Sequence, residues 1–539
     1  MELKVYTREP DEAAYPAGLA YSVHMACRAE GGEFRPWNKN YGILFAEAQI
    51  REDDTLLTKA VREPRIFAMD DGSYGIAARS VFENGDEDHD SRDKVLLWKT
   101  KDFITFTYEG LVGVSQSGWE QASDCITAGA KILEQAIEYW TPVHNVRITV
   151  PDQVEVNSEE EVDLIRAAAW YSDGSDVSKK VVWDKADIDF TAEGSHMIEG
   201  SVVDESFPFP LAVGYGDPVI FPWEGKWYYI STNDNTDDIG LYVREADSVR
   251  ELFLEGVTEH LILAKDEARE LIQTFWAPEF HVIGDELYLL FAVSGHVWGP
   301  QCHMMRLKKG APITEAASWE DPVRVTKADG SFLTEEGITL DMTYLKTDRC
   351  SYVVWSYRKH IGTALDTGSM LYIATIDDRE PWKLTSEPVL LSRPLLGWEN
   401  VAGTINNEGP YAFVRDGKVY LTYSGGSANS YTYVLGLLTA RAKDDLLQTA
   451  SWEKRCAPVL SFYSVEGEYG PGHNSFYVNE EGELMIAYHA ETALDRTIRC
   501  DGIRRVHFRH NGMPEFGMSA AEDLNPLLQK VRTQIVIKK

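Results

Sequence analysis

The sequence predicts an all-β protein, because short strand-like segments recur along it at a regular spacing and turn residues separate them. Five segments pair a turn with apolar and aromatic residues: GKWYYIS, DELYLLFA, CSYVVWS, GKVYLTYS and GELMIAYH. The steps between them are 60, 65, 67 and 65 residues. Repeats of this length are typical of four-stranded blades. Five of them predict a five-bladed β-propeller over residues 206–539, preceded by two smaller β regions.

The second of these regions, residues 143–205, has short alternating runs with turns at DGSD and EGS, which predict a small antiparallel sandwich. Its YSDGS motif (171–175), followed by Val182, Trp183 and Asp184, resembles bacterial immunoglobulin-like modules. The resemblance implies an immunoglobulin-like β-sandwich. A spacer is the simpler interpretation, and a carbohydrate-binding module is the alternative.

The first region, residues 1–142, is also β-like and contains one segment, 62–80, that matches the later repeat. We expect an N-terminal accessory region with a blade-like sheet. Glu63 occupies the position that carries polar residues in the later repeats. This region supplies no catalytic partners for it, so a degenerate repeat is the expected explanation.

Composition limits the partners. The chain has 52 Lys and Arg residues against 86 Asp and Glu residues, a net charge of −34. Such a field repels phosphate backbones and anionic membrane surfaces, so we expect neither nucleic acid nor a membrane as partner. No apolar run reaches the length of a membrane span. A neutral ligand fits best, and the oligomeric state stays open.

The six cysteines are scattered without a CxxC pair, which argues against a zinc site and a disulfide framework. The first residues, MELKVYTREPDEAAYP, lack the pattern of a secretory signal. These two observations predict a cytoplasmic bacterial protein with free thiols.

A polar residue precedes each repeated strand at a similar distance. Counted back from the strand markers, these residues lie 10, 8, 11, 11 and 11 positions earlier, and they are Asp217, Glu279, Asp341, Glu408 and His473. Equivalent positions on the inner strands of a propeller face one axis. We therefore expect four carboxyl groups and one imidazole to converge there.

Converging carboxyl groups shift one another's pKa values, so that some stay protonated while others are ionised near neutral pH. Glycoside hydrolysis needs such a pair, with one acid at the leaving oxygen and one carboxylate that activates water or attacks the sugar. The pattern predicts a glycosidase.

The motifs GDP, FWAPEFH, ITLDMT, NNEGPY and YGPGHNSF occur in an order that resembles glycoside hydrolase family 43, in particular its exo-acting α-L-arabinofuranosidases, over about residues 212–520. The resemblance implies that Asp217 is the general base, that Glu408 is the general acid, and that Asp341 tunes and orients the acid. It also implies inversion of the anomeric configuration, with the two carboxyl groups roughly 6.5–9.5 Å apart.

The resemblance leaves other residues open. Many members carry the tuning Asp in a WAPD motif, whereas this chain has Glu279 there, so we assign Asp341 and expect Glu279 to bind a substrate hydroxyl. Trp276 and Trp298 are candidates for stacking on sugar, and core packing is the alternative for either. His473 is expected to contact substrate, or to hold through water a calcium ion that some members bind at the propeller axis. No cofactor is expected to be required. Arg358 and Arg505 are weaker candidates for the site.

Three hypotheses follow. The first is an inverting enzyme that removes terminal α-L-arabinofuranosyl residues from oligosaccharides or from arabinan and arabinoxylan fragments. The second is a β-xylosidase or another furanosidase of the same family, and the third is a non-catalytic carbohydrate-binding propeller. The loops 291–303 and 423–434 follow repeated strands and are expected to narrow the mouth of the site, which would favour exo action.

Overall fold

The computed structural model describes residues 1–538 and confirms an all-β protein. It divides into two compact units. The first comprises Met1–Thr141, Phe209–Tyr477 and Ile486–Gly502, and the second comprises Pro142–Pro208, Val478–Met485 and Ile503–Lys539. The predicted division was 1–142, 143–205 and 206–539. The structure instead groups residues 1–141 with the bulk of the repeat region.

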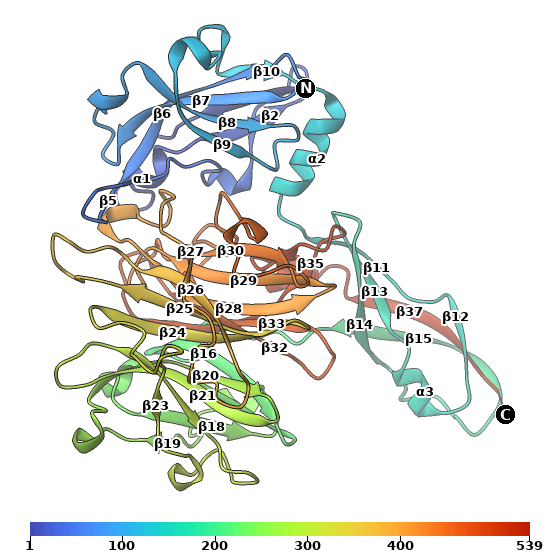
Figure 1. Cartoon of the computed structure of the whole chain (residues 1–539). Helices are drawn as coiled ribbons and strands as arrows, with labels where there is room; N and C mark the ends of the chain where they lie inside the picture. The colour runs from blue at the N-terminus through green and yellow to red at the C-terminus, as the bar shows by residue number, and fades with distance from the viewer. Residues whose placement is uncertain (539) are drawn as a thin grey trace. The chain divides into compact units, whose positions relative to one another are not determined.

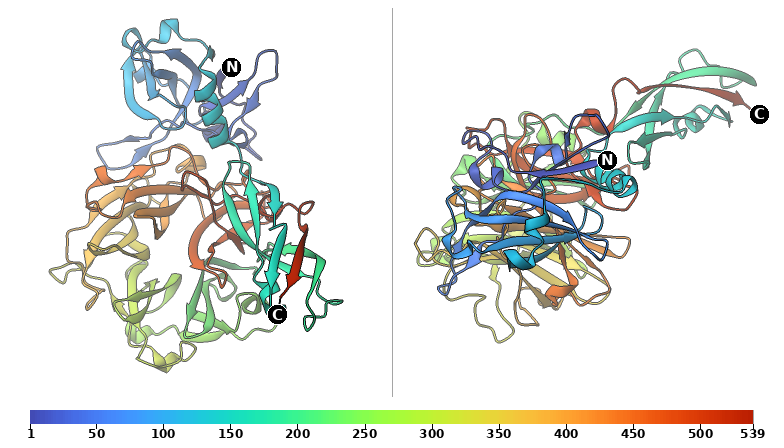
Figure 2. Two further views of the ribbon diagram at one scale, coloured as in Figure 1. Left: turned by 90° about the vertical axis from the view of Figure 1, so that its right-hand side faces the viewer. Right: turned by 90° about the horizontal axis from the view of Figure 1, so that it is seen from above.

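Five sheets follow one another along the repeat region, and each begins near one of the predicted polar residues (Figure 1). In the left view of Figure 2 they are arranged around a common centre, from green through orange to red. We call them the first to fifth sheets. The first sheet consists of β16 (Tyr215–Trp223), β17 (Lys226–Asn233), β18 (Leu241–Ala246) and β19 (His260–Leu263), and the second of β20 (Gln273–Ile283), β21 (Glu286–Ser294), β22 (Gln301–Arg306) and β23 (Val323–Arg324). The third sheet consists of β24 (Ile338–Lys346), β25 (Ser351–Arg358), β26 (Met370–Ile376) and β27 (Val389–Ser392), and the fourth of β28 (Asn407–Arg415), β29 (Lys418–Gly425), β30 (Val434–Arg441) and β31 (Glu453–Lys454). The fifth sheet consists of β32 (Tyr469–Val478), β33 (Leu484–Glu491) and β34 (Cys500–Arg505).

A bulge interrupts the first strand of each of the first four sheets, where the pairing register shifts. Bulge residues of positive φ include Asp217 (58°), Ala277 (47°), Asp341 (54°) and Gly409 (56°), one from each of these strands. His473 in β32 also has a positive φ, of 37°. Non-glycine residues adopt this region at a cost, and bulges re-aim side chains beside functional sites.

The bulges also explain how adjacent sheets are joined. At four of the positions of positive φ, the backbone N–H donates to the adjacent sheet: Ala277 N to Thr232 Oγ1 (2.9 Å), Gly409 N to Asp341 Oδ2 (3.0 Å), His473 N to Ser424 Oγ (2.8 Å) and Asp217 N to His489 Nδ1 (3.2 Å). The last bond joins the first sheet to the fifth.

These positions correct the predicted register. Asp217, Asp341 and His473 do occupy equivalent positions of positive φ, but Ala277 and Gly409 take the other two. Glu279 lies two residues beyond its bulge residue and Glu408 one residue before its own. Counting residues back from the strand markers gave the wrong register because it assumed an unbroken strand between each polar residue and its marker.

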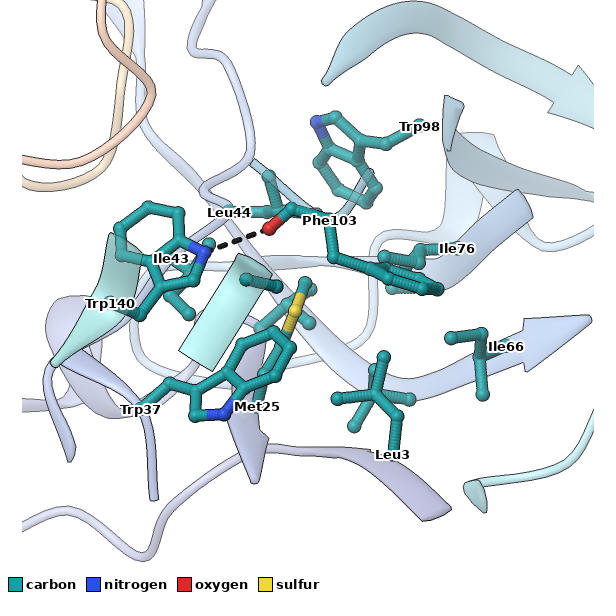
Figure 3. Packing of buried hydrophobic residues seen from close by; sticks show 14 of the residues in the cluster. Leu3, Met25, Trp37, Ile43, Leu44, Ile66, Ile76, Trp98, Phe103 and Trp140 are labelled. Carbon is teal, nitrogen blue, oxygen red and sulfur yellow. Dashed lines mark hydrogen bonds between the residues drawn. The ribbon is translucent and has the colours of Figure 1, made fainter. Parts of the chain in front are cut away.

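Residues 1–141 form two main sheets, of order β10-β1-β2-β3 and β6-β7-β8-β9, around a common apolar core. Leu3, Met25 and Ile66 pack there with Trp37, and Trp140 Nε1 donates to the carbonyl oxygen of Phe103 (2.8 Å; Figure 3). The elements are β1 (Glu2–Tyr6), α1 (Ala17–Ala20), β2 (His24–Arg28), β3 (Arg35–Pro36), β4 (Gln49–Ile50), β5 (Leu56–Leu57), β6 (Lys59–Ala68), β7 (Tyr74–Phe82), β8 (Lys94–Thr100), β9 (Thr107–Gly113), β10 (Cys125–Thr127) and α2 (Ala130–Trp140).

The sheet β6–β9 repeats the architecture of the later sheets. Its first strand has the same register shift, and Glu63 at the bulge has a φ of 50°. Glu63 lies outside the cavity described below.

The N-terminal region shares a core with the third and fourth sheets. Tyr15, Leu19 and Phe45 belong to one buried cluster with Trp398 and Val401. Hydrogen bonds join the same regions, from Arg393 Nη1 to Asp54 Oδ1 (2.7 Å) and from Ala402 N to Glu83 Oε1 (2.6 Å). Glu83 begins the acidic segment ENGDEDHDSRD (83–93).

The second unit contains one six-stranded sheet of order β11-β13-β14-β15-β37-β12. Its strands are β11 (Asn145–Thr149), β12 (Gln153–Val156), β13 (Ala167–Tyr171), β14 (Asp176–Trp183), β15 (Gly194–Val203) and β37 (Lys530–Ile537), and α3 (Glu159–Asp163) follows β12. Strand β37 pairs antiparallel with β15 and parallel with β12. The predicted repeat region, 206–539, included this C-terminal strand, because a pairing partner more than 300 residues away leaves no local signal.

The remaining short elements are β35 (His507–Phe508), β36 (Pro514–Glu515) and α4 (Ala520–Asp523). All six cysteines are unpaired. Among residues 1–538, no helix has the length and apolar character needed to cross a membrane.

Candidate active site

Asp217 lies at the centre of a buried charge cluster. Its side chain is 7% exposed and projects from the bulge in β16. Oδ1 lies 3.1 Å from Arg499 Nη1 and 3.1 Å from His473 Nδ1, and Oδ2 accepts a hydrogen bond from Thr232 Oγ1 (2.5 Å). The carboxylate therefore has donors on both oxygens.

These neighbours fix its ionisation. Burial raises the pKa of Asp217, but the charges of His473 and Arg499 outweigh burial and hold the pKa well below the usual range for Asp. Burial lowers the pKa of His473, but Asp217 outweighs it and raises the pKa to about 9. At neutral pH the pair is an aspartate and an imidazolium.

His489 is the neutral member of this cluster. Burial lowers its pKa to about 4, so that Nδ1 is free to accept the backbone N–H of Asp217. Its ring stacks on Tyr433, with 5.5 Å between centroids and 6° between planes. The Tyr433 hydroxyl in turn donates to Glu408 Oε1 (3.0 Å). His489 and Tyr433 thus join Asp217 to Glu408.

Glu408 is in the opposite state from Asp217. Burial, followed by the negative charge of Asp341, raises its pKa to about 7. Glu408 is therefore mostly protonated below about pH 7, where Asp217 is ionised.

The pKa of Asp341 falls between those of Asp217 and Glu408. Asp341 is 3% exposed, and its Oδ2 accepts hydrogen bonds from Gly409 N (3.0 Å) and Ser356 Oγ (3.4 Å). Burial raises its pKa to about 6 although His473 opposes the shift. Because Gly409 adjoins Glu408, the first of these bonds fixes the backbone that carries the acid.

The three carboxyl residues line one cavity of about 660 Å³ in the first unit, together with His473, Arg499 and Tyr433, whereas His489 lies behind its wall. Six residues singled out from the sequence line it: Asp217, Trp276, Asp341, Arg358, Glu408 and His473. Trp276 Nε1 donates to Asp238 Oδ2 (2.9 Å), which fixes the indole at the cavity wall. Arg358 is held by Asp366 (2.7 and 2.8 Å) and Asn406 (3.0 Å).

Other candidates lie elsewhere. Glu279 does not line this cavity: it is 2% exposed and its Oε2 lies 2.6 Å from His281 Nε2. Its placement after the bulge, not on it, accounts for this difference from the expected substrate contact. Trp298 stacks on His303 instead (5.9 Å), and Arg505 lies in the second unit with Asp523.

The sequence did not indicate four residues of the site: Arg499, His489, Tyr433 and Asp238. They lie in other strands and in loops, outside the repeat position that we followed. The acidic loop NDNTDDIG after the first repeated strand was a usable signal, since it supplies Asp234, Asp237 and Asp238. Of the two expected rim loops, 423–434 contributes Ser427, Ala428, Asn429 and Tyr433, and 291–303 contributes no lining residue.

The residues do not fit a directly bound metal ion. His473 Nδ1 is engaged with Asp217, and the raised pKa keeps the imidazole protonated, so it has no lone pair to offer there. Within residues 1–538, no group of three or more His, Cys, Asp or Glu side chains has a metal-binding arrangement. No step below involves a metal.

One carboxyl group with a lowered pKa and another with a raised pKa, in one cavity of an all-β scaffold, form the kind of pair that glycoside hydrolysis requires. The model of the glycosyl hydrolases family 43 matches residues 210–514. The chain belongs to this family.

Several proteins that this chain resembles are named as arabinofuranosidases. An extracellular exo-α-(1→5)-L-arabinofuranosidase of Streptomyces avermitilis is 32% identical over 333 residues, which are 60% of this chain and 65% of the relative. A protein of the same name from Streptomyces chartreusis is 31% identical over 52% of this chain and 81% of its own. The crystal structure of an α-L-arabinofuranosidase from Lactobacillus brevis, 27% identical, superposes with a TM-score of 0.51 and covers 59% of this chain and 98% of that one.

The predicted cytoplasmic location is wrong. Both Streptomyces relatives are named as extracellular proteins. The prediction rested on unpaired cysteines and on the first residues of the chain, and neither fixes a compartment.

Proposed function

We propose that this chain is an inverting, exo-acting α-L-arabinofuranosidase. The observation that carries the proposal is the opposite ionisation of Asp217 and Glu408 in one cavity, with the pKa of the first held low and that of the second raised to about 7. Environments that separate two pKa values in this way assign the base and the acid.

In the proposed reaction a water molecule attacks the anomeric carbon as the bond to the leaving oxygen breaks. Asp217 takes the proton from the water, and Glu408 gives its proton to the leaving oxygen. Asp217 then carries a proton and Glu408 a negative charge, and exchange with solvent restores both. Direct attack by water inverts the anomeric configuration.

Asp341 acts through Glu408. Its negative charge raises the pKa of the acid, and its hydrogen bond to Gly409 N holds the acid's backbone. Arg499 and His473 keep the base ionised, and Trp276 and Arg358 are placed to contact the sugar. A calcium ion held through water near His473 stays a prediction.

The relatives' names support α-L-arabinofuranosyl groups as the substrate, and they do not favour the β-xylosidase alternative. A chain that only bound carbohydrate would not need three carboxyl groups whose pKa values differ in this way. The loop residues Ser427, Ala428 and Asn429 at the cavity support action on a chain end. The large negative charge argues against nucleic acid and anionic membranes as partners.

The first to fifth sheets are proposed as the blades of a five-bladed propeller. The bond from Asp217 N to His489 Nδ1, which joins the first sheet to the fifth, supports closure of the ring. The second unit is proposed as an immunoglobulin-like spacer whose last strand is β37.

A panel of nitrophenyl glycosides tests the activity. We expect release of nitrophenol from the α-L-arabinofuranoside, and release at least tenfold slower from the β-D-xyloside. Faster turnover of the xyloside would replace the proposed substrate, and turnover of no glycoside would favour a binding protein.

A further inference from the structure

A second cavity, of about 510 Å³, lies in the same unit as the active site and shares no lining residue with it. Aromatic side chains form part of its wall. Trp355 and Tyr372 stack with 6.1 Å between centroids and 25° between planes, and Tyr357 meets Tyr372 edge to face at 5.6 Å and 84°. Trp355 is buried, whereas both tyrosines remain partly exposed. Rings that are packed on one side and open on the other are suited to stacking on a sugar.

The end of one strand separates the two cavities. Tyr357 lines the second cavity and the next residue, Arg358, lines the active site. Successive side chains of a strand point to opposite faces, and consecutive Cα atoms are about 3.8 Å apart. Ser369 and Met370, at the start of the neighbouring strand, also lie between the two cavities. The carbonyl oxygen of Ser369 accepts a hydrogen bond from Asn407 N, next to Glu408, whereas Met370 lines the second cavity. The two cavities are therefore close neighbours.

Polar groups of both signs surround the rings. The side chains of Lys327 and Lys359 face the same cavity as the carboxylates of Asp54, Glu335, Glu336 and Glu387. Such a rim offers both donors and acceptors to hydroxyl groups, and its excess of carboxylates disfavours an anionic ligand. Asp54 belongs to the N-terminal region. Its Oδ1 lies 2.7 Å from Nη1 of Arg393, which follows the third sheet. The N-terminal region thus completes the wall of this cavity.

We propose that this second cavity binds a neutral saccharide segment, and that it holds a polysaccharide beside the active site while chain ends are cleaved. The chemistry of the cavity defines the ligand as a neutral sugar. Its identity as an arabinose-containing polymer rests on the proposed function.

Affinity electrophoresis of the full chain in gels that contain arabinan or arabinoxylan tests the proposal without relying on activity. We expect Tyr372→Ala to reduce retardation at least fivefold, and Tyr372→Phe, which keeps the ring, to retain it. In kinetic assays Tyr372→Ala should raise KM for the polymer about five- to tenfold. The same variant should leave kcat/KM for nitrophenyl α-L-arabinofuranoside within twofold, because Tyr372 does not line the active site.

Tyr372 packs on Trp355, so its loss could disturb the fold. Glu387→Ala, at an exposed position on the rim, provides a second variant, and it should weaken retardation at least twofold with an unchanged melting temperature. Equal retardation of the parent, Tyr372→Ala and Glu387→Ala would overturn the proposal. Retardation by another neutral polysaccharide, lost in Tyr372→Ala while arabinofuranosides are not hydrolysed, would keep this site and reject the proposed function. Retardation by polygalacturonate alone would reject the neutral ligand.

Discussion

At the scale of single residues, the ionisation of the two principal carboxyl groups follows from their neighbours and not from burial alone. Burial raises the pKa of both Asp217 and Glu408. Asp217 faces His473 and Arg499, which reverse the effect, whereas Glu408 faces Asp341, which adds to it. The sequence placed the three carboxyl groups by their repeat spacing, but Arg499 and Tyr433 had no repeated partner to reveal them.

Removing the acid should differ from removing the base. Asp217→Asn should reduce kcat by roughly 10²–10⁴-fold on every substrate, because water must always be activated. Glu408→Gln should cost as much on arabino-oligosaccharides and far less on a nitrophenyl arabinofuranoside, whose leaving group needs little protonation. Steady-state kinetics on both substrates checks this. Equal losses on the two substrates in Glu408→Gln would remove Glu408 from the role of acid.

The dependence of activity on pH should follow Glu408. Its pKa is raised, so the reactive protonated form is present at lower pH and is lost as the pH rises through about 7. Asp341→Asn removes a negative charge that raises this pKa, so the alkaline limb of kcat/KM should move to lower pH. Tyr433→Phe removes a hydrogen bond that lowers it, so the limb should move to higher pH. Shifts in the same direction would contradict these assignments.

At the scale of elements, the bulge in the first strand of each of the first four sheets places the site. It turns Asp217 and Asp341 towards the cavity and releases backbone N–H groups that bond to the adjacent sheet. The sequence predicted the strands, because turn residues and apolar runs are local signals. It could not predict which residue stands on the bulge, since the register shift depends on pairing with the next strand.

Gly409 tests the importance of the bulge. Its φ is +56°, and an added Cβ would lie 2.8 Å from His473 Cγ. Gly409→Ala should displace His473 from Asp217 and lower kcat by an order of magnitude or more. Gly417 in the following turn also has a positive φ, of +73°, but open space around it. Gly417→Ala is therefore the control for backbone strain, and comparable losses of kcat in both variants would contradict a specific role for His473.

At the scale of the whole chain, residues 1–141 are bound to the repeat region through a shared core. Tyr15, Leu19 and Phe45 are at most 2% exposed and pack in the cluster that contains Trp398. The sequence predicted an accessory region here but could not predict this contact, because packing between segments hundreds of residues apart leaves no periodic pattern. The same limit hid the return of β37 to the second unit.

Phe45→Ala should destabilise both regions together. Deleting a buried phenylalanine side chain costs about 3–5 kcal/mol. Unfolding by urea, followed by tryptophan fluorescence and by residual activity, should show one transition shifted to lower urea. Ile50→Ala, at a residue that is 48% exposed, should change the free energy of unfolding by no more than about 0.5 kcal/mol. Loss of the N-terminal signal with full retention of activity would show that the two regions unfold independently.

The most direct test of the proposed mechanism is proton NMR of the sugar released in the first minutes from nitrophenyl α-L-arabinofuranoside by the unmodified protein. Direct attack by water, activated by Asp217 and assisted by Glu408, predicts that β-L-arabinose appears first and that the α anomer grows in later by mutarotation. Initial release of the α anomer would contradict an inverting pair. It would require one of these carboxyl groups to attack the sugar itself.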